Sequence, residues 1–186
     1  MRLFLAITPP PDSRRRIFAA VEPLRAAAPN VAWVPEPLLH LTLKFLGEQP
    51  ADAVTAIRAA IEDVVSRYRA LALLVSGVGA FPDFRHARVI WMGAQPELAL
   101  ELLHRDIEGA LEPLGFPVDA RPFQAHLTLG RVRRPDRTAL QYLSARADQI
   151  RFRHEVQVRS VDLMSSHRSR PGPRYRCVAS AILGRV

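Results

Sequence analysis

The sequence predicts an α+β fold of two related lobes, and a repeated tetrapeptide is the main reason. His-Leu-Thr-Leu occurs at 40–43 and again at 126–129, an offset of 86 residues (126 minus 40). The same offset places the apolar run 3–7 on 89–93. Such self-similarity indicates an internal duplication. We therefore expect residues 1–186 to form a single domain of two related lobes, each a small sheet with covering helices.

Both halves of the chain show the same order of elements: strand, helix, histidine strand, helix, strand. Apolar runs indicate the strands, and apolar residues at helical spacing indicate the helices. In the first half we expect strands at 3–7, 40–46 and 71–78, helices at 13–28 and 52–68, and a loop over 77–88. In the second half we expect strands at 87–93 and 126–132, helices at 97–114 and from Asp136 to 148, and a terminal hairpin of 155–164 and 175–183 around a turn at 165–173.

Composition narrows the class of protein. No apolar run approaches the ~20 residues of a membrane-spanning helix, and the N-terminus does not read as a signal peptide. Cys177 is the only cysteine, which excludes an internal disulfide and favours a cytoplasmic location; its apolar neighbours predict a buried side chain. The net charge of +8 suits an anionic partner such as RNA. All but one of the 26 basic residues are arginine, however, a bias that genome composition also produces; the exception is Lys44.

The repeated strands carry side chains suited to acid–base chemistry. Because side chains alternate along a strand, His40 and Thr42 share one face with Lys44, and His126 shares a face with Thr128. Imidazole exchanges protons near neutral pH, so two of them can act as a general acid and a general base. Threonine hydroxyls can donate hydrogen bonds to phosphate oxygens. This combination indicates hydrolysis of a phosphodiester, and a cyclic phosphodiester of ribose is an apt substrate.

Competing interpretations of the histidines are weaker. A lone histidine on a strand is usually structural, but a duplicated His-x-Thr is not explained in that way. Zinc requires three or four ligands, and neither motif has a carboxylate or thiol nearby on its histidine face, so we expect no metal and no other cofactor. Among the other histidines, His86 and His167 lie in expected loops where either could face a substrate. His104 is expected at the surface of a helix, and His154 has no special context.

The two motifs resemble the paired signatures of the 2H phosphoesterase superfamily. The matching segments are His-Leu-Thr-Leu-Lys-Phe-Leu-Gly at 40–47 and His-Leu-Thr-Leu-Gly-Arg at 126–131. More specifically, the chain is similar to the bacterial and archaeal RNA 2′,3′-cyclic phosphodiesterases, also called 2′-5′ RNA ligases. The opening segment 2–7, the Gly-Ala-Phe-Pro segment at 79–82 and Pro-Phe at 122–123 extend the resemblance over nearly the whole chain.

The resemblance implies a bilobed α+β fold of two pseudo-twofold lobes, each a small, mostly antiparallel sheet with covering helices, and a basic active-site groove between the lobes. It also implies metal-independent hydrolysis of an RNA-terminal 2′,3′-cyclic phosphate to a 2′-phosphate, with 2′-5′ ligation as a further activity in some members. By analogy, His40 would be the general acid toward the 3′ oxygen and His126 the general base toward water. Thr42 and Thr128 would bind the phosphate.

Two further residues are candidates for substrate binding. Arg131 matches an arginine that often follows the second motif and could contact the phosphate, but strict alternation turns it away from His126 unless a bulge intervenes. The first motif has Phe45 at that position. Phe84 could stack on a base or could anchor its loop in the core.

We expect a cytoplasmic monomer that acts on RNA ends and does not associate with membranes. Two alternatives stay open. One is a phosphoesterase for a small cyclic phosphate or a 2′-5′ oligonucleotide. The other is a non-catalytic RNA-binding module.

Overall fold

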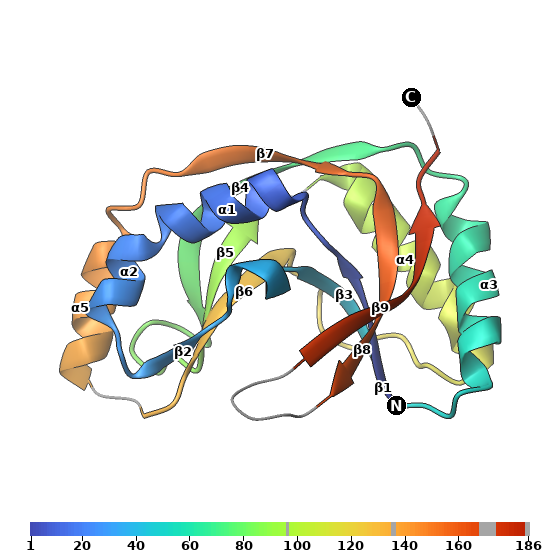
Figure 1. Ribbon diagram of the computed structural model, residues 1–186, viewed down its shortest axis with the longest axis horizontal. Helices are drawn as coiled ribbons and strands as arrows, with labels where there is room; N and C mark the ends of the chain where they lie inside the picture. Colours follow the sequence, from blue (N-terminus) through green and yellow to red (C-terminus); the bar gives the residue numbers. More distant parts are fainter. Residues whose placement is uncertain (96, 135–136, 168–173, 185–186) are drawn as a thin grey trace.

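The computed structural model describes residues 1–95, 97–134, 137–167 and 174–184. A nine-stranded sheet runs in the order β7-β4-β5-β6-β3-β1-β8-β9, with β2 paired to β6. The named strands pair antiparallel throughout, and the sheet curls between two groups of helices (Figure 1). The strands are β1 (Arg2–Ile7), β2 (Val31–Trp33), β3 (Leu41–Glu48), β4 (Leu71–Phe81), β5 (Val89–Ala94), β6 (His126–Val132), β7 (Arg153–Val158), β8 (Ser160–His167) and β9 (Arg174–Ile182).

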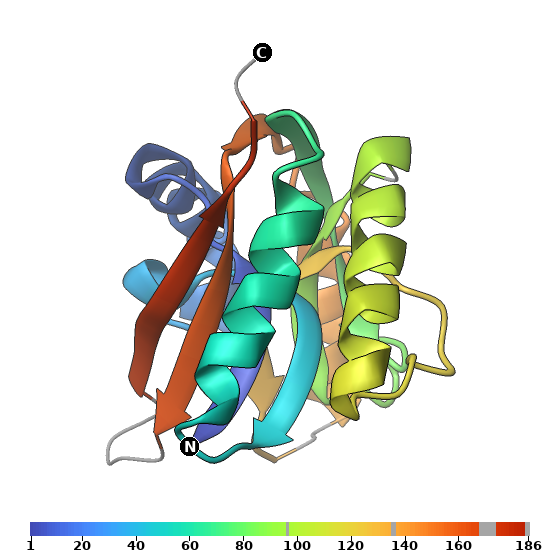
Figure 2. The same ribbon diagram turned by 90° about the vertical axis from the view of Figure 1, so that its right-hand side faces the viewer.

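The sheet consists of two lobes that meet at its centre. Strand β3 of one lobe pairs there with β6 of the other, at Leu41 and Leu127. We call β3, β1, β8 and β9 the β1 lobe, and β6, β5, β4, β7 and β2 the β5 lobe. Helices α3 and α4 lie side by side on the β1 lobe (Figure 2), whereas α1, α2 and α5 pack on the β5 lobe. The helices are α1 (Pro11–Ala20), α2 (Glu22–Ala27), α3 (Ala53–Val65), α4 (Leu98–Leu111) and α5 (Arg137–Ala147), with short 3-10 turns at Glu36–Leu38 and Glu112–Leu114.

Each lobe contains elements from both halves of the sequence. Helix α4 comes from the second half of the chain but packs with α3 on the lobe that contains β1 and β3. Helices α1 and α2 come from the first half and cover the β5 lobe, while β8 and β9 complete the β1 lobe. One buried hydrophobic cluster includes side chains of both lobes. The expected bilobed α+β architecture is therefore present, but neither half of the chain builds a lobe alone.

The helix expected over 13–28 is two helices. α1 ends at Ala20 and α2 begins at Glu22, with Val21 between them at φ −98° and ψ 9°. Pro23 explains the break, because its ring has no N–H to donate and collides with the preceding turn of a continuous helix. The helical spacing of apolar residues continues across Val21, so the sequence pattern did not indicate the break.

The loop expected over 77–88 was too long. β4 continues to Phe81 and pairs with β5 down to Phe81 and Val89. Gly77 has a positive φ of 69° and lies at a register shift between Ser76 and Val78, so it marks a bulge and not the end of the strand. The glycines of this segment belong to a strand.

The strand expected over 155–164 is two strands. β7 ends at Val158 and pairs with β4, whereas β8 begins at Ser160 and pairs with both β1 and β9. The hairpin of β8 and β9 agrees with expectation, although most of its turn lies outside the described residues, as does Asp136, the expected first residue of a helix. The short strand β2 was not expected at all.

The 86-residue offset places the apolar run 3–7 on 89–93, but in the structure these two runs correspond with an offset that is one residue shorter. Leu5 pairs with Lys44 and Ile90 pairs with Gly130. Since Lys44 and Gly130 occupy the same position after their motifs, Leu5 corresponds to Ile90 and not to Trp91. Within the described residues, no helix is both long enough and apolar enough to cross a membrane.

Candidate active site

The two motifs meet at the centre of the sheet. Leu41 pairs with Leu127 between antiparallel strands, so this register sets His40 across from Thr128 and Thr42 across from His126. Both leucines are 1% exposed, whereas the histidines and threonines are half-buried on the opposite face. We call that side of β3 and β6 the histidine face. The pseudo-twofold relation thus brings all four polar side chains together.

Each histidine is oriented by a carbonyl two residues before it. The Nδ1 atom of His40 lies 2.7 Å from the Leu38 oxygen, and Nδ1 of His126 lies 2.7 Å from the Gln124 oxygen. A carbonyl oxygen only accepts, so Nδ1 carries the hydrogen in both rings. In the neutral imidazole this leaves Nε2 as the free acceptor. Both rings are therefore prepared to exchange a proton through Nε2.

Aromatic rings surround both imidazoles. The His40 ring lies 5.1 Å from Phe4 and 5.2 Å from Tyr175, with the tyrosine edge-on. These neighbours restrict the orientation of the imidazole and exclude water from its flank. Their role was not anticipated, because Phe4 read only as part of a buried strand and Tyr175 lies 135 residues (175 minus 40) from the motif.

The His126 ring has different partners. Phe81 lies 5.0 Å away, edge-on, and Trp91 lies 6.3 Å away. Gly79 makes room for the indole, since a Cβ there would stand 2.2 Å from Trp91 Cζ2. Phe81 was assigned to a loop from the sequence, which concealed its place beside the histidine.

The pKa of His40 lies below its usual value of about 6.5. Burial is the largest cause, and the positive charges of Arg131 and His126 add to it, while the hydrogen bond to Leu38 opposes it. His40 is therefore mainly neutral in the free protein near pH 7. The guanidinium of Arg131, on the strand of the other motif, is thus one of the charges that disfavour the protonated form of His40.

Equivalent bulges follow both motifs and reset the alternation of side chains. On β3 the register with β1 shifts between Thr42 and Lys44, so Leu43 is the extra residue. On β6 the register with β5 shifts between Thr128 and Gly130, so Leu129 is the extra residue. These leucines lie 86 residues apart (129 minus 43), like the histidines.

The bulges decide where the next side chains point. Trp91 lies beside His126, and Arg131 pairs with Val89, two residues from Trp91 on the same face of β5, so the bulge required to bring Arg131 to the histidine face is present. Phe45, its counterpart, is 64% exposed and lies 6.0 Å from the Phe4 ring. Lys44 was expected on the face of His40, which is wrong: it is 3% exposed on the opposite side, paired with Glu108.

Phe84, His86 and His167 were the other candidates for contact with a substrate. Phe84 is half-buried and packs against the core, which agrees with the anchoring alternative. His86 is exposed in a turn with Asp83, and His167 is exposed at the end of β8.

Two sequence expectations fail here. His104 is not a surface residue: its side chain is 13% exposed, and its ring stacks on Phe123 at 4.0 Å. Cys177 is exposed and not buried, because β9 lies at the edge of the sheet. His154 lies 2.9 Å from the Ser13 hydroxyl. Within the part of the chain that the structure describes, no three His, Cys, Asp or Glu side chains are grouped so as to hold a metal ion.

Comparison with known proteins gives a consistent result. An Archaeoglobus fulgidus protein called RNA 2′,3′-cyclic phosphodiesterase is 31% identical over 95% of this chain and 97% of its own length. A Geobacillus stearothermophilus protein of the same name is 31% identical over 69% of this chain, a match that spans 41% of that relative.

Solved structures align with nearly the whole chain, and a sequence signature assigns the chain to a family. A Thermus thermophilus structure aligns with a TM-score of 0.80 and 27% identity, covering 98% of both chains. Escherichia coli LigT in complex with 3′-AMP aligns with a TM-score of 0.72 and 26% identity, covering 98% of this chain and 97% of that one. The sequence signature of the 2′-5′ RNA ligase superfamily matches residues 9–170. The chain therefore belongs to the 2′-5′ RNA ligase superfamily.

Proposed function

We propose that this protein is an RNA 2′,3′-cyclic phosphodiesterase that opens a terminal ribose 2′,3′-cyclic phosphate to a 2′-phosphate. One observation carries the proposal: two imidazoles on paired strands each have Nδ1 held by a carbonyl, which leaves Nε2 as the acceptor of the neutral ring. A general acid and a general base of this kind contribute roughly 10²–10⁴-fold each to a hydrolysis. The names of the relatives point to the same substrate class.

The reaction assigns one proton transfer to each histidine. Nε2 of His126 takes a proton from water, and the water oxygen bonds to phosphorus. The bond between phosphorus and O3′ breaks, and O3′ receives a proton from Nε2 of His40, leaving the phosphate on O2′. Afterwards His126 carries the extra proton and His40 is neutral, so the return of one proton from His126 to solvent and of one to His40 resets the site.

The surrounding groups stabilise the charge on phosphate. The hydroxyls of Thr42 and Thr128 can donate hydrogen bonds to the non-bridging oxygens, where negative charge grows in the transition state. The guanidinium of Arg131 supplies a nearby positive charge. The acid role of His40 depends on substrate, because the low pKa leaves it mainly neutral until a bound phosphate anion favours its protonated form.

The direct test is to incubate the purified protein with RNA ending in a 2′,3′-cyclic phosphate, with and without EDTA, and to identify the product by mass and by susceptibility to a 3′-specific phosphatase. We expect a 2′-phosphate and equal rates in both samples. A 3′-phosphate would contradict the assigned bond cleavage, and loss of activity with EDTA would contradict a metal-free mechanism.

The size of the substrate is the open choice within this chemistry. The related LigT forms a complex with 3′-AMP, a mononucleotide, so small substrates belong in the comparison. A panel of cyclic mononucleotides, cyclic-phosphate RNA and 2′-5′ dinucleotides separates an RNA-end enzyme from one that prefers small cyclic phosphates. Ligation of a 2′-phosphate end to a 5′-hydroxyl, tested with the same RNA, reports the reverse reaction. Salt-sensitive RNA binding without any product would indicate a binding module instead.

We also propose that the protein acts as a cytoplasmic monomer. All of the groups assigned above come from one chain, so catalysis does not require a second copy. The single cysteine suits a reducing compartment. Light scattering at working concentration measures the oligomeric state, and a stable dimer would contradict the proposal.

A further inference from the structure

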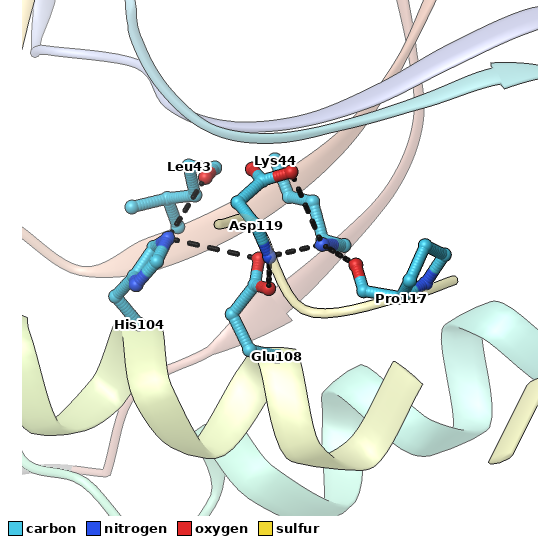
Figure 3. A network of polar contacts seen from close by, with 6 residues as sticks. All are labelled: Leu43, Lys44, His104, Glu108, Pro117 and Asp119. Carbon is cyan, nitrogen blue, oxygen red and sulfur yellow. Dashed lines mark hydrogen bonds and ion pairs between the residues drawn. The ribbon is translucent and has the colours of Figure 1, made fainter. Parts of the chain in front are cut away.

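A buried ion pair lies directly behind the first motif. Lys44 Nζ is 2.7 Å from Glu108 Oε1 on α4, and the side chains are 2% and 4% exposed (Figure 3). The ammonium also donates to the Pro117 oxygen at 2.8 Å, and Glu108 Oε2 accepts from the backbone N–H of Asp119 at 2.8 Å. The pair therefore bonds β3 and α4 to the segment 117–119, which leads to the second motif.

Its composition is unusual for this chain. Lys44 is the single lysine among 26 basic residues. A compact ammonium with three donors fits Glu108 and the Pro117 carbonyl in a small space, whereas a planar guanidinium is larger and fixed in geometry. Buried ion pairs contribute little to stability compared with apolar residues of similar volume, because desolvation offsets their attraction. Stability alone therefore does not account for this pair.

His104 adds a second connection one helical turn earlier on α4. Its Nε2 donates to the oxygen of Leu43 at 3.2 Å, and Leu43 is the bulge residue that follows Thr42. Its ring stacks on Phe123 at 4.0 Å and 13°. Phe123 lies three residues before His126. One face of α4 thus touches the chain immediately after the first motif and immediately before the second.

The β5 lobe uses a different connection at the matching place. The residues that correspond to 117–119 by the 86-residue offset are 31–33, which form β2 and pair with β6 through backbone hydrogen bonds. Glu22 corresponds to Glu108 but forms a surface ion pair with Arg25. Side-chain hydrogen bonds hold the segment 117–119 in the β1 lobe, whereas strand pairing holds the corresponding segment 31–33 in the β5 lobe.

We propose that Lys44, Glu108 and His104 are positioning residues that hold the segment 117–125 against β3 and so fix His126 opposite His40. The inference rests on the proposed function, since it concerns the spacing of the acid and the base. Misplacement of a reacting group by about 1 Å can lower a rate by about 10²-fold. A device that sets this spacing without touching substrate acts on kcat more than on KM.

The test is the double variant Lys44→Met with Glu108→Met, which removes both charges together and leaves no unpaired buried charge. We expect kcat on a cyclic-phosphate substrate to fall by roughly 10–100-fold, with KM nearly unchanged and the urea midpoint close to that of the unaltered protein. Glu22→Met, at the matching position of the other lobe, is the control and should leave kcat unchanged. His104→Phe keeps the stack on Phe123 and loses the bond to Leu43, so kcat should fall by a smaller factor.

A readout independent of turnover separates this inference from the proposed function. Histidine ring resonances followed by NMR against pH report the pKa of His40, which the charges of His126 and Arg131 help to lower. If those groups move away in the double variant, that pKa rises, whether or not the cyclic phosphate is a substrate. An unaltered kcat, a loss confined to KM, or an unchanged His40 titration would each overturn the inference; if the double variant fails to fold, His104→Phe decides by the same measurements.

Discussion

The strands that carry the two motifs are alike up to their bulges and different afterwards. After Leu43, β3 continues with buried Lys44 and exposed Phe45. After Leu129, β6 continues with Gly130 and exposed Arg131. The repeat therefore supplies equal histidines and threonines, but only β6 adds a cation to the histidine face. A symmetric pair of imidazoles lies in an asymmetric electrostatic field, and that difference can give the two histidines distinct roles in the proposed reaction.

We propose that the lobes derive from duplication of one strand–helix unit, as the common offset of motifs and bulges suggests. Duplication places two identical groups around a pseudo-twofold axis. Hydrolysis needs opposite roles from them at any instant, one histidine protonated and one neutral. Residues outside the repeated identity, such as Arg131 and Phe45, supply the distinction.

Removal of either histidine tests the symmetric part of this comparison and should have the largest effect. We expect His40→Ala and His126→Ala each to lower kcat/KM by roughly 10²–10⁴-fold, since each removes one proton-transfer group. Circular dichroism and thermal unfolding serve to show that the fold is retained. Near-normal turnover in either variant would contradict the two-histidine mechanism.

The sequence predicted the symmetric part well, because it depends on local identity. The motif repeat, strand alternation and apolar helix spacing located His40, His126 and their threonines. Alternation failed from Lys44 onward, since a bulge inserts one residue and nothing in a single sequence marks it. The burial of Lys44 had one signal, its status as the only lysine, but its partner Glu108 lies 64 residues away (108 minus 44).

The aromatic neighbours were missed for a related reason. Tyr175 reaches His40 because β9 pairs with β8 and β8 with β1, a sheet order that the chain order does not reveal. The contact of Phe81 was missed because the end of its strand was assigned to a loop. Contacts fixed by long-range pairing become predictable only once the strand order is known.

Arg131 tests the asymmetric part, and the next largest effect is expected there. Arg131→Met removes the cation that we propose stabilises the phosphate, while it retains most of the side-chain length, and loss of such a stabilising group lowers kcat by roughly 10²-fold. Phe45→Leu at the matching position of β3 removes no charge and should change kcat far less. Steady-state kinetics on one cyclic-phosphate substrate compare the two. Equal losses would contradict the assigned asymmetry.

A substitution at Gly130 tests the pairing of β2 with β6, which in the β5 lobe corresponds to the buried ion pair of the β1 lobe. A Cβ at Gly130 would lie 2.6 Å from Val31 Cγ1 and 3.1 Å from Trp33 Cε3. We therefore expect Gly130→Ala to displace β2 and to lower the free energy of unfolding by about 1–3 kcal/mol. Urea unfolding measures this change. Gly109→Ala is the matched control and should not be destabilised, because among the described residues the added Cβ meets nothing within 4 Å beyond the adjacent backbone of its own helix.

The smallest expected effect is a shift in the pH profile. Arg131 helps to lower the pKa of His40, so Arg131→Met should raise that pKa. Because kcat/KM reports the pKa values of the free enzyme, the limb of the profile that reports His40 should move to higher pH, whether His40 acts as the acid or as the base. Profiles of kcat/KM against pH for Arg131→Met and the unaltered protein measure this shift. A profile with neither limb moved would show that Arg131 does not act on His40.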